Sequence, residues 1–332
     1  MSIRRMAIAG LPVIAALIIA CPLRAQTTPT IKVGLPSLSM FSVMNGVAKD
    51  LGYFDREGVN VEINHFESGS LNIKALLARS VDVSDVETGL ILGAVANGAD
   101  LRIIGTQAQN LHFALYARKD IPDLKGIYGH TFAISGIGGL PHLVLLALLD
   151  RQNLDVNQIK LLTVGGTSAR LNALMAGKVD ATLGEYSPKV EADPSVHRLM
   201  IVSKELPLYM AQGLAVWGDT LDARKDALKR WQRALVKATR WAYDHKKEFL
   251  AAAGKELPTS SDELGKIYDF YMTARVWSIN GELDPKRIAY MQDLGLRTKT
   301  QSSRVDLAKL VWLDNVKAID AELGHRDYPA RP

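Results

Sequence analysis

Two stretches of the sequence repeat each other at an offset of 98 residues: Ala75–Asp85 reads ALLARSVDVSD and Ala173–Leu183 reads ALMAGKVDATL. Five of the eleven positions are identical, and the change from Leu77 to Met175 conserves side-chain volume. Each stretch has the pattern of a helix end that passes through a tight turn into a short apolar strand. Any two βαβ units share that pattern, but not the string A-L-x-A-x-x-V-D, so the string indicates an internal structural repeat.

The sequence around the repeated strings follows the same order of elements twice. The expected strand, helix and second strand lie at 31–35, 41–51 and 59–64 in one copy and at 131–135, 140–152 and 159–164 in the other. The chain therefore reads β-α-β-α-β twice, which predicts an α/β fold with two lobes around a central cleft. From Asp222 onward the pattern is helical, with helices expected up to Pro258, at 262–275, at 284–294 and at 305–323.

Residues 1–25 have the pattern of a secretory signal peptide. Arg4 and Arg5 precede an uncharged, largely apolar run of 14 residues, which is short for a membrane span and typical of a signal sequence. We expect cleavage after Ala25 and a periplasmic location. The alternative is a lipoprotein, because Ile18–Cys21 resembles a lipobox that would leave Cys21 lipidated.

The charge and the cysteine count exclude several classes of protein. The formal net charge is +5, but the leader contains three arginines and no acidic residue, so its removal leaves +5 − 3 = +2. No block of five or six like charges follows, so we expect no nucleic-acid partner. Cys21 is the single cysteine, which excludes an internal disulfide and a cysteine-rich metal site in the mature chain.

Sequence motifs for catalysis are weak. The strings G-x-S-x-G and G-x-x-x-x-G-K-[ST] are absent, and the nearest match to a dinucleotide fingerprint, Gly136–Pro141, ends in proline. The seven histidines show no zinc-helix spacing. We therefore predict no catalytic residue, no metal and no cofactor.

Loops suited to binding occur at equivalent strand ends in both copies: Gly34–Ser37, Glu67–Ser70, Ser135–Pro141 and Gly165–Ser168. Each loop alone is typical of a glycine turn with a capping hydroxyl. Four such loops at equivalent strand ends indicate a binding site, because the free N–H groups at the helix starts come together at that edge of the sheets. Acidic residues follow the third strand of each copy. In a binding role these carboxylates would favour a ligand with an amine, a protonated ring nitrogen or another hydrogen-bond donor. In a structural role they would cap a helix or close a salt bridge between the lobes. The candidate ligand-binding residues are Ser37, Ser68, Ser84, Asp85, Ser135, Gly136, Gly138, Thr167, Glu185 and Tyr186.

Several segments resemble one known family. Gly52–Glu62 (GYFDREGVNVE) is similar to the GYF-x-x-E-G segment of periplasmic substrate-binding proteins of the sulfonate, nitrate, taurine and thiamine-pyrimidine-precursor type. Asp123–Gly126 (DLKG) resembles the start of their second lobe, and the string Ala173–Asp180 and the pair Gly295-Leu296 are also similar to theirs. The resemblance covers about 31–323.

The resemblance implies a type II periplasmic binding fold and a transport function. Lobe 1 would comprise 30–116 and 213–325, lobe 2 would comprise 117–212, and hinges would lie at Tyr116–Ala117 and Gln212–Leu214. The expected function is an exported, monomeric receptor that closes on a small organic solute by hinge motion and delivers it to the permease of an ABC importer, which its ATPase powers. The alternatives are an enzyme of the same fold that acts on a small aromatic acid, decarboxylase-like, and a sensor. The fungal pyrimidine-synthesising enzymes of this fold have a cysteine-rich motif that this chain lacks.

Overall fold

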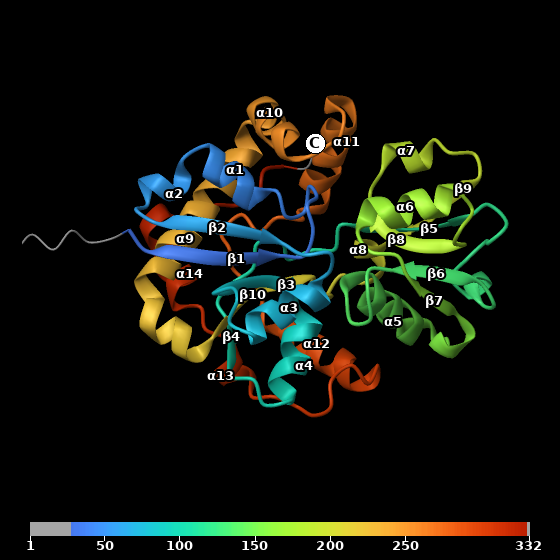
Figure 1. The fold of residues 1–332 in the computed structure, drawn as a ribbon, viewed down its shortest axis with the longest axis horizontal. Helices are drawn as coiled ribbons and strands as arrows, with labels where there is room; N and C mark the ends of the chain where they lie inside the picture. The colour runs from blue at the N-terminus through green and yellow to red at the C-terminus, as the bar shows by residue number, and fades with distance from the viewer. Residues whose placement is uncertain (1–27, 331–332) are drawn as a thin grey trace, which may run out of the picture.

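The computed structural model describes residues 28–330 and contains two α/β lobes, each built on a five-stranded sheet (Figure 1). The first sheet has the order β2-β1-β3-β10-β4 and the second β7-β6-β8-β5-β9. The strands of the first sheet are β1 (Thr30–Leu35), β2 (Asn60–His65), β3 (Val83–Glu87), β4 (Leu101–Ile103) and β10 (Gln212–Trp217). Those of the second are β5 (Phe113–Arg118), β6 (Thr131–Ile134), β7 (Lys160–Thr163), β8 (Ala181–Glu185) and β9 (Val196–Ile201). The predicted α/β class and two-lobed architecture are confirmed.

The two sheets have the same internal arrangement. Three strands are parallel in each, β2-β1-β3 in one and β7-β6-β8 in the other. The fourth strand is antiparallel in both, and the lobes exchange it: β10 pairs with β3, and β5 pairs with β8. The sheet order thus repeats as the shared string predicts.

Helices cover both sheets. Lobe 1 has α1 (Met44–Asp50), α2 (Tyr53–Arg56), α3 (Gly69–Leu77) and α4 (Thr88–Ala96), and lobe 2 has α5 (Leu140–Gln152), α6 (Thr167–Met175), α7 (Pro188–Glu191) and α8 (Val202–Glu205). Two short 3-10 turns, η1 (Lys125–Ile127) and η2 (Val156–Gln158), also belong to lobe 2. The C-terminal segment contributes α9 (Gly218–Asp244), α10 (Lys246–Glu256), α11 (Ser261–Ala274), α12 (Pro285–Arg297), α13 (Leu307–Leu310) and α14 (Asp314–Leu323). Among residues 28–330, no helix combines the length and the apolar character needed to cross a bilayer.

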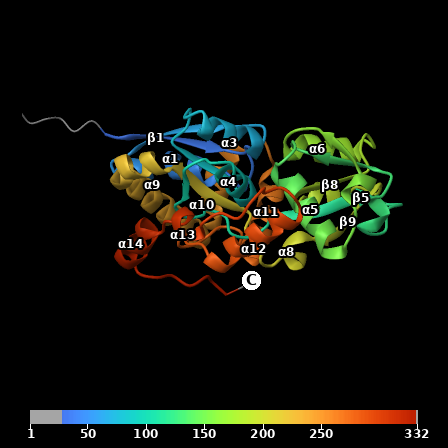
Figure 2. The ribbon, with the colours of Figure 1, turned by 90° about the horizontal axis from the view of Figure 1, so that it is seen from below.

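The helical C-terminal segment was predicted, and two of its helices differ in detail. The helix expected up to Pro258 breaks at His245 into α9 and α10. The helix expected at 305–323 is two helices, because Val311 leaves the helical path to bridge Ile103 at the edge of the first sheet. Figure 2 shows these helices along lobe 1, with α12 at the boundary to lobe 2, where Arg297 pairs with Asp150 at 3.1 Å.

The aspartate of each repeated string fastens the third strand to the first. In lobe 1 the Lys32 N–H donates to Asp82 Oδ2 at 2.8 Å, and Arg224 pairs with the other oxygen at 2.7 Å. In lobe 2 the Thr131 N–H donates to Asp180 Oδ2 at 2.8 Å, and Arg118 pairs with Oδ1 at 2.8 Å. The shared Val-Asp pair therefore has the same structural role in both lobes.

Replacing Asp180 with alanine should lower the free energy of unfolding by ~2 kcal/mol, because the Thr131 N–H and hydroxyl and the Arg118 guanidinium lose a shared acceptor. Urea denaturation measures the loss. Asp120→Ala is the control, because Asp120 also pairs with Arg118 but lies on the surface, where ion pairs contribute little. Equal losses in the two variants would contradict the role given to Asp180.

The sheets show where the chain crosses between the lobes. Because β5 belongs to the second sheet, the first crossing lies between Ile103 and Phe113, before the predicted hinge at Tyr116–Ala117. The lobe boundary expected after residue 116 was therefore placed too late in the sequence. The second crossing lies between Ile201 and Gln212, next to the predicted position.

The core consists of three clusters of buried side chains. One fills the space between the first sheet and α1, α9, α10 and α11, and it includes the fully buried Trp231 and Trp277. The second extends from α3 and α4 across the crossing segments to α5, and so joins the two lobes. The third lies between the second sheet and α6. Trp231 and Trp277 are thus core residues.

Candidate functional site

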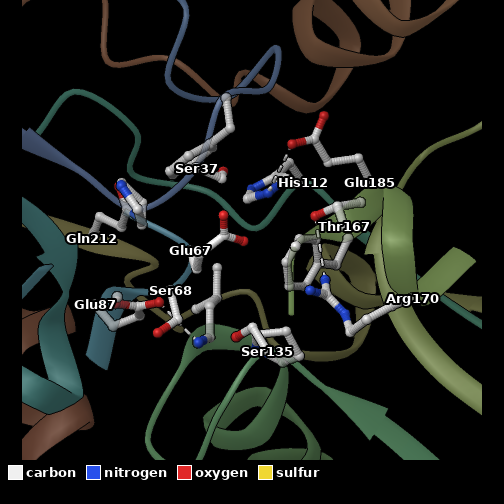
Figure 3. Close-up of a pocket in the computed structure, with 17 residues that line it drawn as sticks. Ser37, Glu67, Ser68, Glu87, His112, Ser135, Thr167, Arg170, Glu185 and Gln212 are labelled. Carbon is white, nitrogen blue, oxygen red and sulfur yellow. Dashed lines mark hydrogen bonds and ion pairs between the residues drawn. The ribbon is translucent and has the colours of Figure 1, made fainter. Parts of the chain in front are cut away.

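A cleft lies between the lobes at the carboxyl ends of their parallel strands (Figure 3). Its inner chamber has a volume of about 40 Å³ and opens beside a wider outer cavity of about 420 Å³. Loops after β1, β2 and β3 form one wall, and loops after β6, β7 and β8 form the other. The inner chamber is lined chiefly by Ser37, Phe41, Glu67, Ser68, Glu87, His112, Ser135, Gly166, Thr167, Arg170, Glu185 and Gln212.

The structure brings six of the ten candidate residues to this cleft. Ser37, Ser68, Ser135, Thr167 and Glu185 line the inner chamber, and Tyr186 lines the outer cavity. Their contact with a ligand stays a prediction.

The other four candidates lie elsewhere. Ser84 and Asp85 are buried inside lobe 1, because β3 continues through them to Glu87 before the strand ends. Gly136 and Gly138 lie where the two lobes meet: a Cβ on Gly136 would be 3.7 Å from Ser68 Oγ, and a Cβ on Gly138 would be 3.0 Å from Leu90 of the opposite lobe. None of these four residues is among those that line either cavity of the cleft, and their contact with a ligand stays a prediction.

Glu87 occupies the innermost end of the chamber. It is 2% exposed, and its Oε1 accepts a hydrogen bond from the Leu140 N–H of the other lobe at 2.8 Å. Burial raises the pKa of Glu87 to about 7, although the Leu140 N–H lowers it. Its second oxygen, Oε2, has no hydrogen-bond partner among residues 28–330.

Arg170, on α6, is a buried cation of the cleft wall, and it is 2% exposed. Its guanidinium donates to the Gly165 carbonyl at 2.6 Å, to the Leu183 carbonyl at 3.1 Å and to the Thr167 hydroxyl at 3.3 Å. Burial lowers the pKa of Arg170 to about 10, and the Glu185 carboxylate partly opposes this shift. The residue thus fixes the loop that carries Thr167 and places positive charge near Glu185.

Glu185 and His112 lie on the side of the chamber away from Glu87 (Figure 3). Burial raises the pKa of Glu185 to about 7, while Ser39, Tyr271 and the Arg170 charge lower it. The His112 ring stacks on Phe41 with centroids 4.0 Å apart, and its Nε2 lies 3.9 Å from Glu185. Burial lowers the pKa of His112 well below its ordinary value, and the Arg170 charge lowers it further, so the imidazole is neutral.

The outer rim contains contacts between the lobes. Tyr186 stacks on Phe270 of α11, with centroids 5.0 Å apart and an angle of 17° between the rings. Ser187, beside it, hydrogen-bonds to Glu263 at 3.2 Å. Together with the Leu140–Glu87 bond, these contacts hold the lobes against each other at both ends of the cleft.

A family model described as NMT1/THI5 like matches residues 45–249. The chain belongs to the NMT1/THI5-like family. The family resemblance read from the sequence is thereby confirmed.

Three proteins similar to this NMT1/THI5-like chain are themselves described as binding proteins. It is 24% identical over 301 residues to YtlA of Bacillus subtilis (strain 168), whose name describes a binding protein, and the match covers 80% of this chain and 88% of YtlA. The alkanesulfonate-binding protein SsuA of Xanthomonas axonopodis pv. citri, bound to MOPS, has a similar fold, with a TM-score of 0.71, 19% identity and coverage of 86% of this chain and 98% of SsuA. The periplasmic nitrate-binding protein NrtA of Synechocystis PCC 6803 gives a TM-score of 0.75 and 11% identity, covering 90% of each chain. The predicted solute-binding function agrees with these relatives.

Sequence reasoning missed several residues of the NMT1/THI5-like cleft: Phe41, His112, Arg170 and Gln212. A signal existed for Arg170. At the repeat offset it aligns with Asn72, whose amide donates to the carbonyl of Asp85 at 2.9 Å, as Arg170 donates to the carbonyl of Leu183. Extending the repeat three residues upstream of Ala75 would have marked both positions. His112 lies on the first crossing segment and Gln212 is the first residue of β10, so both are outside the repeat.

Proposed function

We propose that this protein is an exported receptor that captures one small organic solute in the interlobe cleft and delivers it to the permease of an ABC-type importer. The observation that carries the proposal is that six strand ends, three from each sheet, meet at one cavity. Neither lobe encloses this cavity alone. A solute held there contacts both lobes and so stabilises their closed arrangement.

The contacts between the lobes support a hinged opening. At the cleft they include the Leu140–Glu87 bond, a hydrogen bond at 2.7 Å from the Ser70 hydroxyl to the Ile137 carbonyl, and the contacts of the outer rim. Two crossing segments connect the lobes behind the cleft. Rotation about these segments would expose the chamber, and a permease would distinguish the closed from the open form.

Gly166→Phe tests the location of the site. A Cβ on Gly166 has no atom within 4 Å, its backbone angles suit any L-residue, and the residue lines both parts of the cleft. The added ring should fill the cleft and weaken solute binding at least 100-fold without unfolding the chain. Thr163→Phe adds the same ring on the exposed β7 and should leave affinity unchanged.

The measurement is a thermal-shift panel of sulfonates, nitrate, pyrimidines, aromatic carboxylates and amines on the mature chain. Saturating ligand at about 1,000 times its Kd stabilises the folded state by ~4 kcal/mol. We expect one class to raise the melting temperature of the wild type and not of Gly166→Phe, and mass spectrometry to recover that solute unchanged. Conversion to product without a partner would favour the enzyme alternative, and equal shifts in both proteins would contradict the proposed site.

A further inference from the structure

Three helices begin around the Glu87 carboxyl group. Glu87 is the residue before α4, and its Oε1 accepts from the N–H of Leu140, the first residue of α5. A Cβ on Gly69, the first residue of α3, would lie 1.6 Å from Glu87 Oε2, so only glycine leaves room for the carboxylate there. The Glu87 side chain therefore fills the point where the amino ends of α3, α4 and α5 meet. Figure 3 shows it beside Ser68, the residue before α3.

Such a junction attracts anions. Amino ends of helices combine unpaired N–H groups with the positive end of the helix dipole. At α5 the Leu140 N–H is the group in reach, because Pro141 has none, and Glu87 already uses it. A small oxyanion from solution would have to displace the protein's own carboxylate.

Two residues that line the chamber, Glu87 and Gln212, have buried acceptor atoms without a partner. Their side chains are 2% and 1% exposed, and Glu87 Oε2 and Gln212 Oε1 have no hydrogen-bond partner within 28–330. Glu67 and Glu185 add carboxylates to the wall. The Arg170 guanidinium donates hydrogen bonds to the Gly165 and Leu183 carbonyls, so these N–H groups already have backbone acceptors.

We propose that Glu87 is a resident anion that excludes small oxyanions from the helix junction and presents its free oxygen to a nitrogen-bearing donor group of the solute, such as an amine or amidine. This inference rests on the proposed function. It assigns the ligand a polarity opposite to that of the alkanesulfonate and nitrate that SsuA and NrtA are named for. Both sequence-based alternatives for a cleft carboxylate then hold for Glu87, which caps a helix with one oxygen and faces the solute with the other.

The first test offers small anions to the junction. Wild type and Glu87→Ala are titrated with formate, nitrate and methanesulfonate at pH 8 against sodium chloride of matched ionic strength, and melting temperature is recorded. We expect the variant to bind formate or nitrate at least tenfold more tightly than the wild type, because the vacated position accepts an exogenous anion. Saturable stabilisation of the wild type by any of these anions would overturn the proposal, and this arm needs no variant to fold.

The second test varies the head-group charge on one ring. Benzamidine, benzamide and benzoate share a shape and carry positive, neutral and negative groups. The wild type should bind benzamidine at least tenfold more tightly than benzoate, and Glu87→Gln, which keeps an acceptor for the Leu140 N–H, should reduce that preference. Glu62→Gln, on the exposed face of β2, is the matched control and should leave the preference for benzamidine unchanged.

The two hypotheses fail in different ways. If the wild type binds benzoate or methanesulfonate as tightly as benzamidine, the proposed receptor function stands and the role proposed for Glu87 is wrong. A wild type that responds to no probe here and to no solute in the panel overturns the proposed function. A preference for benzamidine that survives in Glu87→Gln also overturns the role of Glu87.

Discussion

Replacing Arg170 with methionine is expected to lower the free energy of unfolding by ~4 kcal/mol, because a buried charge-assisted network is lost and the carbonyls that it satisfied remain buried. The loss has a second effect, on the cleft. Without the Arg170 charge the pKa of Glu185 should rise further above its ordinary value, so the carboxyl group is neutral over a wider pH range. The Gly165–Thr167 loop also loses its anchor, so solute binding should weaken with stability.

Urea denaturation and a thermal-shift titration with the identified solute measure these two effects. Arg304→Met is the control, because Arg304 pairs with Asp293 on the surface with both side chains about half exposed or more. It should leave stability and binding unchanged. Arg170→Lys should recover only part of the loss, since an ammonium group cannot reach both carbonyls in the fixed geometry of a guanidinium. Full stability in Arg170→Met would contradict the structural role.

The unliganded protein is expected to be more stable at pH 5.5 than at pH 8.5. Burial and the neighbouring Glu87 charge raise the pKa of Asp85 to about 8, and burial raises that of Glu87 and of Glu185 to about 7. In the unfolded chain these groups release their protons near pH 4. Between pH 4 and 8 the folded state therefore holds more protons than the unfolded chain, so stability falls as pH rises across this range and levels off above about pH 8.

Asp85→Asn isolates the largest of these contributions. Asp85 is 1% exposed and neither carboxyl oxygen has a partner within the described residues, so its ionisation is costly. The stability advantage of the variant over the wild type should be ~3 kcal/mol larger at pH 8.5 than at pH 5.5, because the wild type loses stability across this range and the amide does not titrate. Urea denaturation at three pH values tests this, with the exposed Asp222→Asn as the control. A constant difference between variant and wild type would contradict the assignment.

The two-lobed fold could be predicted from the sequence because the same β-α-β-α-β order and the same Val-Asp pair occur in both lobes. Val179-Asp180 repeats Val81-Asp82 since each aspartate must accept from the first strand of its lobe. The return of β10 to lobe 1 was expected only from the family resemblance, and the place of β5 in the second sheet was not predicted. Both are short apolar runs that would fit either sheet. Nothing in the local sequence indicates which distant strand each of them pairs with.

The site was predicted in part for a related reason. Glycine turns with capping hydroxyls mark strand ends locally, so Ser68, Ser135 and Thr167 could be found. Arg170 could not be found from a single helix, because an arginine at that spacing usually points to solvent. Its burial depends on Leu183 and Gly165, which approach it only after the strands pair.

The exchange of β10 has a consequence for the order in which the lobes can be completed during synthesis. Lobe 2 spans one uninterrupted stretch from β5 to β9, so all of its strands have left the ribosome by residue 201. Lobe 1 then holds β3 and β4 without the strand that joins them, and both keep an unpaired edge until Gln212–Trp217 emerges. A chain from which β9 has emerged and Gln212–Trp217 has not would contain one complete lobe beside an open sheet, the state in which a chaperone or a protease would find this protein most accessible.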